Sequence, residues 1–155
     1  GLALKGMGAL SGPELGGERL TVAYETRAQE NEHSCFSDNT VSDLADDALG
    51  IDNVCAGRYE RTEGEAVHGT GLCDAVAAHE PALGERLREN VGASLAKLRA
   101  IPAPFDRAIQ GDDGAPGRVA VQAAITALET QANTLAAIAA SYHVRPGDVP
   151  RRRQP

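Results

Sequence analysis

The spacing of apolar positions along the 155-residue chain predicts a helical protein. In residues 117–143 apolar side chains recur in alternating steps of four and three, the spacing of a coiled-coil seam. The seam residues are Val121, Ile125, Leu128, Ala132, Leu135, Ala139 and Tyr142. Similar steps mark residues 40–61 and 81–101 as helices with one buried face. With a further helix over about residues 13–32, the pattern predicts an all-α fold, an antiparallel bundle of about four main helices.

Local signals set the expected boundaries of these elements. The Ser-Gly-Pro-Glu sequence at residues 11–14 reads as a capping box with proline in the first turn, so a helix is expected to begin there and to continue to Glu32. The Thr-Val-Ser-Asp sequence at residues 40–43 offers a second box ahead of the next helix. A short helix is expected over residues 72–79, and Phe105 is expected to plug one end of the bundle.

Composition and charge narrow the possible functions. Aromatic residues make up only 3% of the chain, and small unbranched apolar residues favour packed helices over a β-sandwich. The net charge of -7 argues against a nucleic-acid partner, which would need a basic face, and is compatible with cation binding. No run of about 18 apolar residues occurs, so no transmembrane segment is expected.

The chain is expected to form one domain over residues 1–145, followed by a disordered tail at 146–155. Because Gly1 is not an initiator methionine, the natural N-terminus is expected to lie upstream. The cysteines, Cys35, Cys55 and Cys73, show no CxxC or zinc spacing, and their odd number leaves at least one thiol free or paired outside the chain. We expect buried free thiols.

Acidic side chains form a stripe on the predicted first helix. Glu18, Glu25, Gln29 and Glu32 fall in one narrow sector of the helical wheel, between two apolar edges. One interpretation is a solvated acidic face next to Arg19 and Arg27. The other is a carboxylate-lined site inside the bundle, as di-metal carboxylate proteins build it.

The densest chemistry lies in residues 30–40, between the first two predicted helices. Glu32 and His33 are the best candidates for metal or proton chemistry, because a carboxylate and an imidazole suit iron, zinc or manganese. Adjacent residues of a helix point about 100° apart, so both can bind one ion only if the helix has ended. Ser37 and Asp38 most simply cap the second helix, and Phe36 is of a type that packs. The candidate metal ligands are Glu18, Glu25, Glu32, His33 and Asp38, and the other site candidates are Arg19, Ser34, Cys35, Ser37 and Asn39.

Two long blocks of sequence resemble the imelysin family. They are MGALSGPELGGERL at residues 7–20 and EHSCFSDNT at residues 32–40, supported by GIDNV at 50–54, GRY at 57–59 and PFD at 104–106. More narrowly, the chain resembles the iron-regulated protein A branch of the family, also described as imelysin-like peptidase. The resemblance implies an all-helical fold of two related bundles, exported to the periplasm or cell surface and linked to iron uptake.

The resemblance leads to more than one hypothesis about function. The family's peptidase label rests on a GxHxxE motif in its N-terminal bundle, and this chain contains no such motif, so it resembles the C-terminal half. The preferred hypothesis is non-catalytic binding of iron, or of an iron-related ligand, at an interface with an N-terminal bundle, with iron or zinc as the possible metal. The alternative is a metallopeptidase whose metal motif lies in that other half. A third hypothesis treats residues 30–40 only as an elaborate double cap.

Overall fold

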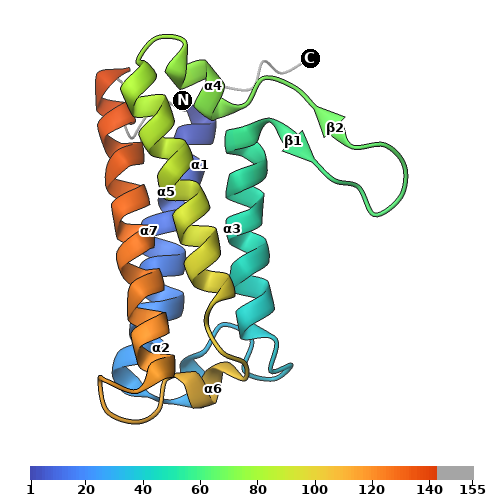
Figure 1. Cartoon of the computed structure of the whole chain (residues 1–155). Coiled ribbons are helices and arrows are strands. Elements are labelled where there is room, and N and C mark those ends of the chain that lie inside the picture. Colours follow the sequence, from blue (N-terminus) through green and yellow to red (C-terminus); the bar gives the residue numbers. More distant parts are fainter. Residues whose placement is uncertain (143–155) are drawn as a thin grey trace, which may run out of the picture.

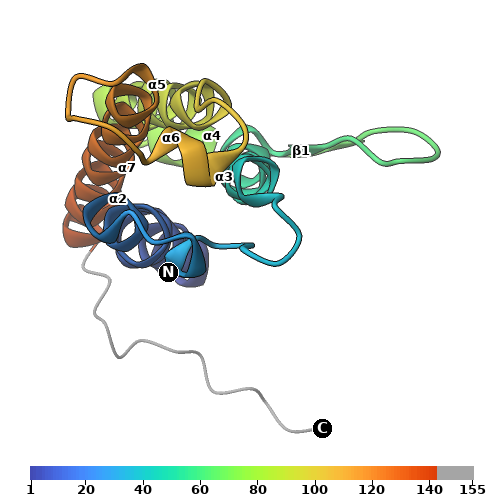
Figure 2. The ribbon, with the colours of Figure 1, turned by 90° about the horizontal axis from the view of Figure 1, so that it is seen from below.

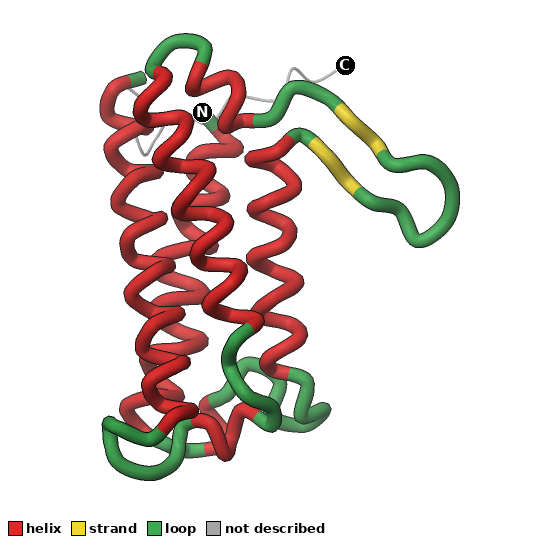
Figure 3. The backbone as a smooth tube through the Cα atoms, in the orientation of Figure 1, coloured by secondary structure: helices red, strands yellow, loops and turns green. Residues whose placement is uncertain are grey.

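The computed structural model describes residues 1–142, which form a bundle of long helices with a projecting β-hairpin (Figures 1 and 3). The prediction of an all-α bundle is therefore confirmed. The expected boundary at residue 145, the tail and His143 lie outside the described residues. None of the helices within residues 1–142 is long and apolar enough to cross a membrane.

The first long helix is continuous from Leu2 to Thr26, in three segments. These are α1 (Leu2–Ala9), the π-helical segment η1 (Leu10–Thr21) and α2 (Val22–Thr26). Inside η1 the hydroxyl of Thr21 donates to the carbonyl of Gly16, 2.6 Å away and five residues back, in keeping with wider turns.

The predicted start of this helix at residues 11–14 is wrong. Ser11 is fully buried and its hydroxyl donates to the carbonyl of Met7 at 2.6 Å, as in a helix interior. Glu14 pairs with Arg19, with 2.6 Å between nitrogen and oxygen, and does not complete a cap. Pro13 lies within η1, whose widened turn relieves the clash that a proline makes with the preceding turn of an α-helix.

The predicted end at Glu32 is also wrong. Arg27 follows α2 in the left-handed conformation, with φ 55°, and this ends the helix. Residues Gln29–Asn31 make a single 3₁₀ turn, η2, and Glu32 is extended, with φ −76° and ψ 154°. Glu32 therefore does not continue the acidic stripe of the first helix.

The second long helix, α3 (Thr40–Ala56), begins at the predicted residue and ends earlier than expected. Gly57, with φ 65°, terminates it, and the chain turns into a hairpin. Strands β1 (Arg58–Tyr59) and β2 (Val67–His68) pair antiparallel, with Tyr59 opposite Val67. Figures 1 and 2 show this hairpin standing away from the bundle.

The remaining helices are α4 (Leu72–Ala77), α5 (Pro81–Arg99), α6 (Phe105–Ala108) and α7 (Pro116–Ser141). Of these, α4, α5 and α7 agree with the apolar spacing to within a few residues, whereas the short α6 was not predicted. Phe105 is buried at the end of the bundle, as predicted. Most of the α7 seam is buried, although Tyr142 is exposed.

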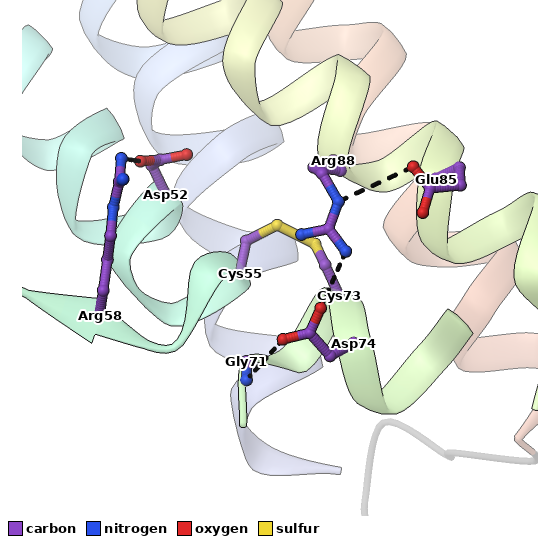
Figure 4. Close-up of a disulfide and its surroundings, with 8 residues drawn as sticks. All are labelled: Asp52, Cys55, Arg58, Gly71, Cys73, Asp74, Glu85 and Arg88. Atoms are coloured by element: carbon purple, nitrogen blue, oxygen red, sulfur yellow. Dashed lines mark hydrogen bonds and ion pairs between the residues drawn. A yellow bond between two sulfur atoms is a disulfide. The ribbon is translucent and has the colours of Figure 1, made fainter. Parts of the chain in front are cut away.

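A disulfide joins the end of α3 to the start of α4, which overturns the expectation of buried free thiols at Cys55 and Cys73 (Figure 4). Cys35 is the free cysteine, and it is half-buried. The backbone is tightly packed beside the disulfide. A Cβ atom on Gly71 would lie 2.1 Å from the carbonyl oxygen of Cys55, so glycine is required there.

Candidate functional site

The loop of residues 27–39 lies at one end of the bundle, near α6 and the start of α7 (Figures 1 and 2). Two contacts hold the first residue of the loop and the end of α2 before it. The side chain of Gln110 donates to the carbonyl of Arg27 at 2.9 Å, and the guanidinium of Arg118 donates to the carbonyl of Tyr24 at 2.9 Å. The loop therefore starts from a fixed position on the bundle.

The second half of the loop is held by Asp43, one turn inside α3. Its carboxylate accepts hydrogen bonds from the hydroxyl of Ser34 and from the amide of Asn39, the latter at 2.7 Å. The backbone N–H of Ser34 donates to the hydroxyl of Thr40 at 3.0 Å. Ser34 and Asn39 thus fasten the loop to the start of α3.

The residues expected to cap α3 do not do so. Asn39 precedes the helix, and Asp38 is exposed with φ 55°. The backbone N–H groups of Ser37 and Asp38 instead bond to the carbonyl of Ser34, at 3.1 and 3.0 Å, and close a turn. Phe36, at this turn, is 104% exposed, contrary to the expectation that it packs.

Glu32 and His33 differ from the rest of the loop because both carboxylate oxygens of Glu32 and Nδ1 of His33 are buried and unpaired. Glu32 is only 4% exposed. Among the described residues, no donor has hydrogen-bond geometry to either of its carboxylate oxygens, and Nδ1 of His33 has no partner either. Buried polar atoms are nearly always paired, so three adjacent exceptions indicate a place that is kept for a ligand or a partner.

The surroundings of Glu32 favour its neutral form. Burial raises the pKa of this carboxyl group above its ordinary value of 4.5. The Thr40 hydroxyl, close by but outside hydrogen-bond geometry, lowers the pKa in part, whereas the charges of Asp106 and Asp38 raise it further. A positive charge in this place would reverse the balance.

Among the other candidate ligands, Asp38 lies close enough for its charge to act on Glu32. Glu18 and Glu25 are exposed on the first helix, as in the solvated-face interpretation, and Arg19 is engaged with Glu14. Within residues 1–142 no group of three or more His, Cys, Asp or Glu side chains is placed to hold a metal ion. The five-residue metal site stays a prediction.

Residues that sequence reasoning missed complete the description of the loop. In the sequence, Asp43 reads only as part of a capping box, and Asp106 only as the last residue of the PFD block at residues 104–106. Asp106 lies about 70 positions from Glu32 in sequence and reaches it only because α6 folds against the loop's end of the bundle. Its proximity has no signal in the local sequence.

The family model for imelysin, a peptidase family by its label, matches residues 2–135. The chain belongs to the imelysin family. Sequence resemblance and family match therefore agree over almost the whole described part. No curated protein matches the chain.

The donor set of this imelysin chain fits a metal only in part. Glu32 and His33 supply a carboxylate and an imidazole, a combination suited to iron, zinc or manganese. Metal sites of this type use about four to six donors. The remaining donors would have to come from outside residues 1–142.

Proposed function

We propose that this chain is a non-catalytic binding component of an imelysin-like protein in bacterial iron uptake. Glu32 and His33 would present one carboxylate and one imidazole to iron or to an iron-related ligand. The observation that carries the proposal is the set of three buried, unpartnered atoms on these two residues. A bound cation would compensate the buried carboxylate that the protein leaves unpaired.

The proposal includes a second helical bundle that supplies the other donors. Support comes from the resemblance to a two-bundle family, and from the shortage of ligands within the described residues. The acidic side chains of Asp38 and Asp106 near Glu32 add a local field that attracts cations.

We also propose an oxidising compartment, the periplasm or the cell surface. The Cys55–Cys73 disulfide supports it, since disulfides persist in such compartments and are rare in a reducing cytosol. Iron capture outside the cytoplasm is consistent with that location.

The test is titration with Fe(II) under argon and with Fe(III) citrate, together with elemental analysis. It is carried out on this chain alone and on a protein that joins it to the second bundle. Glu32→Ala and His33→Ala should each weaken iron binding by the joined protein by about tenfold or more, which is at least about 1.4 kcal/mol. The matched control is Glu30→Ala, an exposed carboxylate in the same loop, which should bind as the wild type does.

Unchanged iron affinity in both variants would contradict the ligand assignment. Chelator-sensitive cleavage of an unfolded peptide by the joined protein would favour the metallopeptidase alternative. Failure of the chain alone to bind iron is expected, because two donors are too few for a stable site.

A further inference from the structure

The bundle is closed on three sides and open on the fourth. The first helix packs along α7, α7 packs along α5, and α5 packs along α3. No comparable contact joins α1 or η1 to α3. The side between α1 and α3 is therefore the part of the described bundle where a further helix has room to pack.

A cavity of about 380 Å³ lies on this open side. Its lining is apolar and comes from both helices: Ala3, Gly6, Met7, Leu10, Gly50, Ile51 and Val54. A Cβ atom added to Gly6 or to Gly50 would meet nothing within 4 Å, so these two glycines leave open space between the helices. Small residues of this kind let another backbone approach closely.

The groove continues toward the hairpin. A second cavity, of about 410 Å³, shares Gly50 and Val54 with the first. Its lining also includes Asn53, Gly57, Tyr59, Val67 and Arg58, whose guanidinium is paired with Asp52 at 3.4 Å. Val54, Tyr59 and Val67 are all exposed large hydrophobic side chains. Together the two cavities form one mainly apolar groove, which we call the α1–α3 groove.

The hairpin wall of the α1–α3 groove is held in place at its base. The Cys55–Cys73 disulfide ties the end of α3 to α4 (Figure 4). Asp74 accepts hydrogen bonds from Arg88 at 2.9 Å and from the N–H of Gly71 at 3.2 Å, and these two donors hold the pKa of Asp74 below its usual range. The wall is thus positioned before any partner arrives.

Acidic side chains beside the groove favour a partner with basic residues. Asp46 and Asp47 lie one turn before Gly50 on the same face of α3, and α3 contains no Lys or Arg. Neither carboxylate makes an ion pair or a side-chain hydrogen bond within residues 1–142. A second copy of this chain, with its net charge of -7, would bring like charges together at this face.

We infer that the α1–α3 groove binds an amphipathic helix of a protein partner. One stripe of that helix is apolar, and basic residues at one end reach Asp46 and Asp47. The inference stands apart from the proposed iron site, because none of the groove-lining residues belongs to the loop of residues 27–39.

The experiment measures fluorescence anisotropy of a labelled helical peptide of about 18 Leu, Ala and Lys residues, added to the full chain. Its Leu and Ala form one stripe and its Lys residues are grouped at one end. We expect saturable binding, and Gly50→Leu should weaken it by about tenfold or more, because the new side chain fills the groove. The Asp46→Asn/Asp47→Asn variant should weaken binding and reduce its salt dependence.

Gly92→Leu is the matched control. Gly92 is an exposed glycine inside α5 where an added Cβ atom also meets nothing within 4 Å, so the substitution should leave peptide binding unchanged. Leucine is a better helix former than glycine at both positions, so both variants should fold. Thermal melts followed by circular dichroism verify this.

The inference is overturned if the peptide does not bind, if a scrambled peptide of equal composition binds as well, or if Gly50→Leu and Gly92→Leu behave alike. It is also overturned if sedimentation equilibrium shows a dimer that Gly50→Leu dissociates. In that case a second copy covers the groove.

Discussion

Two buried charged residues near the same end of the bundle, Arg118 and Glu32, are treated in opposite ways. Arg118 is 3% exposed and Glu32 is 4% exposed. The guanidinium of Arg118 donates to the carbonyls of Tyr24 and Ile109, at 2.9 and 3.0 Å. It also donates to Asp113 at 2.9 Å and stacks 3.8 Å above the ring of Tyr24. Glu32 has no hydrogen-bond partner among the described residues.

The difference shows which of the two buried charged residues stabilises the fold. Arg118 joins α2, the segment after α6 and the start of α7, so its burial is compensated by contacts that the bundle needs. Glu32 is buried with only the partial compensation of the nearby Thr40 hydroxyl, and a poorly compensated buried charge destabilises the protein that carries it. A destabilising residue that no contact of the fold explains is a candidate for binding.

The largest effect is expected from removing Arg118. Arg118→Ala leaves the carbonyls of Tyr24 and Ile109 without their donor and removes the stacking on the ring. It should lower the free energy of unfolding by roughly 2–4 kcal/mol. Urea denaturation followed by circular dichroism measures it. A loss below about 0.5 kcal/mol, the size expected for an ordinary surface substitution, would contradict the claim that the contacts of Arg118 stabilise the fold.

Glu32→Gln should act in the opposite direction. It removes a buried charge with little change of shape, and so should raise the free energy of unfolding at pH 7 by roughly 1–3 kcal/mol. The control is Glu30→Gln in the exposed part of the loop, which should stay within about 0.5 kcal/mol of the wild type. Destabilisation by Glu32→Gln would mean that the carboxylate has a structural partner.

The pH dependence of this gain follows from the raised pKa of Glu32. The folded state holds the proton more tightly than the unfolded state, whose carboxyl group titrates near the ordinary value of 4.5. Below that pH both states are protonated and the carboxyl group carries no penalty. As pH rises from there through the raised pKa, the wild type loses stability relative to Glu32→Gln. The difference between the two unfolding free energies should therefore grow with pH and then level off, and a constant difference would contradict the pKa shift.

Sequence reasoning reached the fold because the helices are read from periodicity within one segment. The seam of α7 and the apolar steps of α5 are local patterns, and the structure follows them. The capping box predicted at Ser11 was wrong because it, too, was inferred from a local pattern alone. Ser11 is a core residue whose hydroxyl accepts a hydrogen bond from Gln131 at 2.6 Å, and this partner lies 120 positions away.

The candidate site could be located by sequence but not described. The block of residues 32–40 lies in the loop that carries the buried unpaired atoms, and the sequence alone makes Glu32 and His33 the best candidates within it. The helical wheel placed Glu32 in line with Glu18 and Glu25 because it assumed that the helix continues past residue 27. A left-handed residue at a helix end is usually glycine or asparagine, so Arg27 gives no sign in the sequence that the helix ends there. The burial of Glu32 without a hydrogen-bond partner depends on α6 and α7 as well as on the loop, so it cannot be predicted from any single segment of the sequence.

The smallest effect is expected at the exposed partner of Arg118, and it sharpens the comparison most. The side chain of Asp113 is 83% exposed, whereas that of Arg118 is 4% exposed, so their ion pair reaches into solvent. An ion pair of this kind contributes at most about 1 kcal/mol and weakens with added salt. Asp113→Asn should therefore cost well under half as much as Arg118→Ala in the same urea experiment, with a difference that shrinks at high salt. If the two substitutions cost the same, the carboxylate and not the buried carbonyls compensates Arg118. The burial of Arg118 would then be compensated by a single opposite charge. Glu32 lacks such a charge, and a bound cation would supply it.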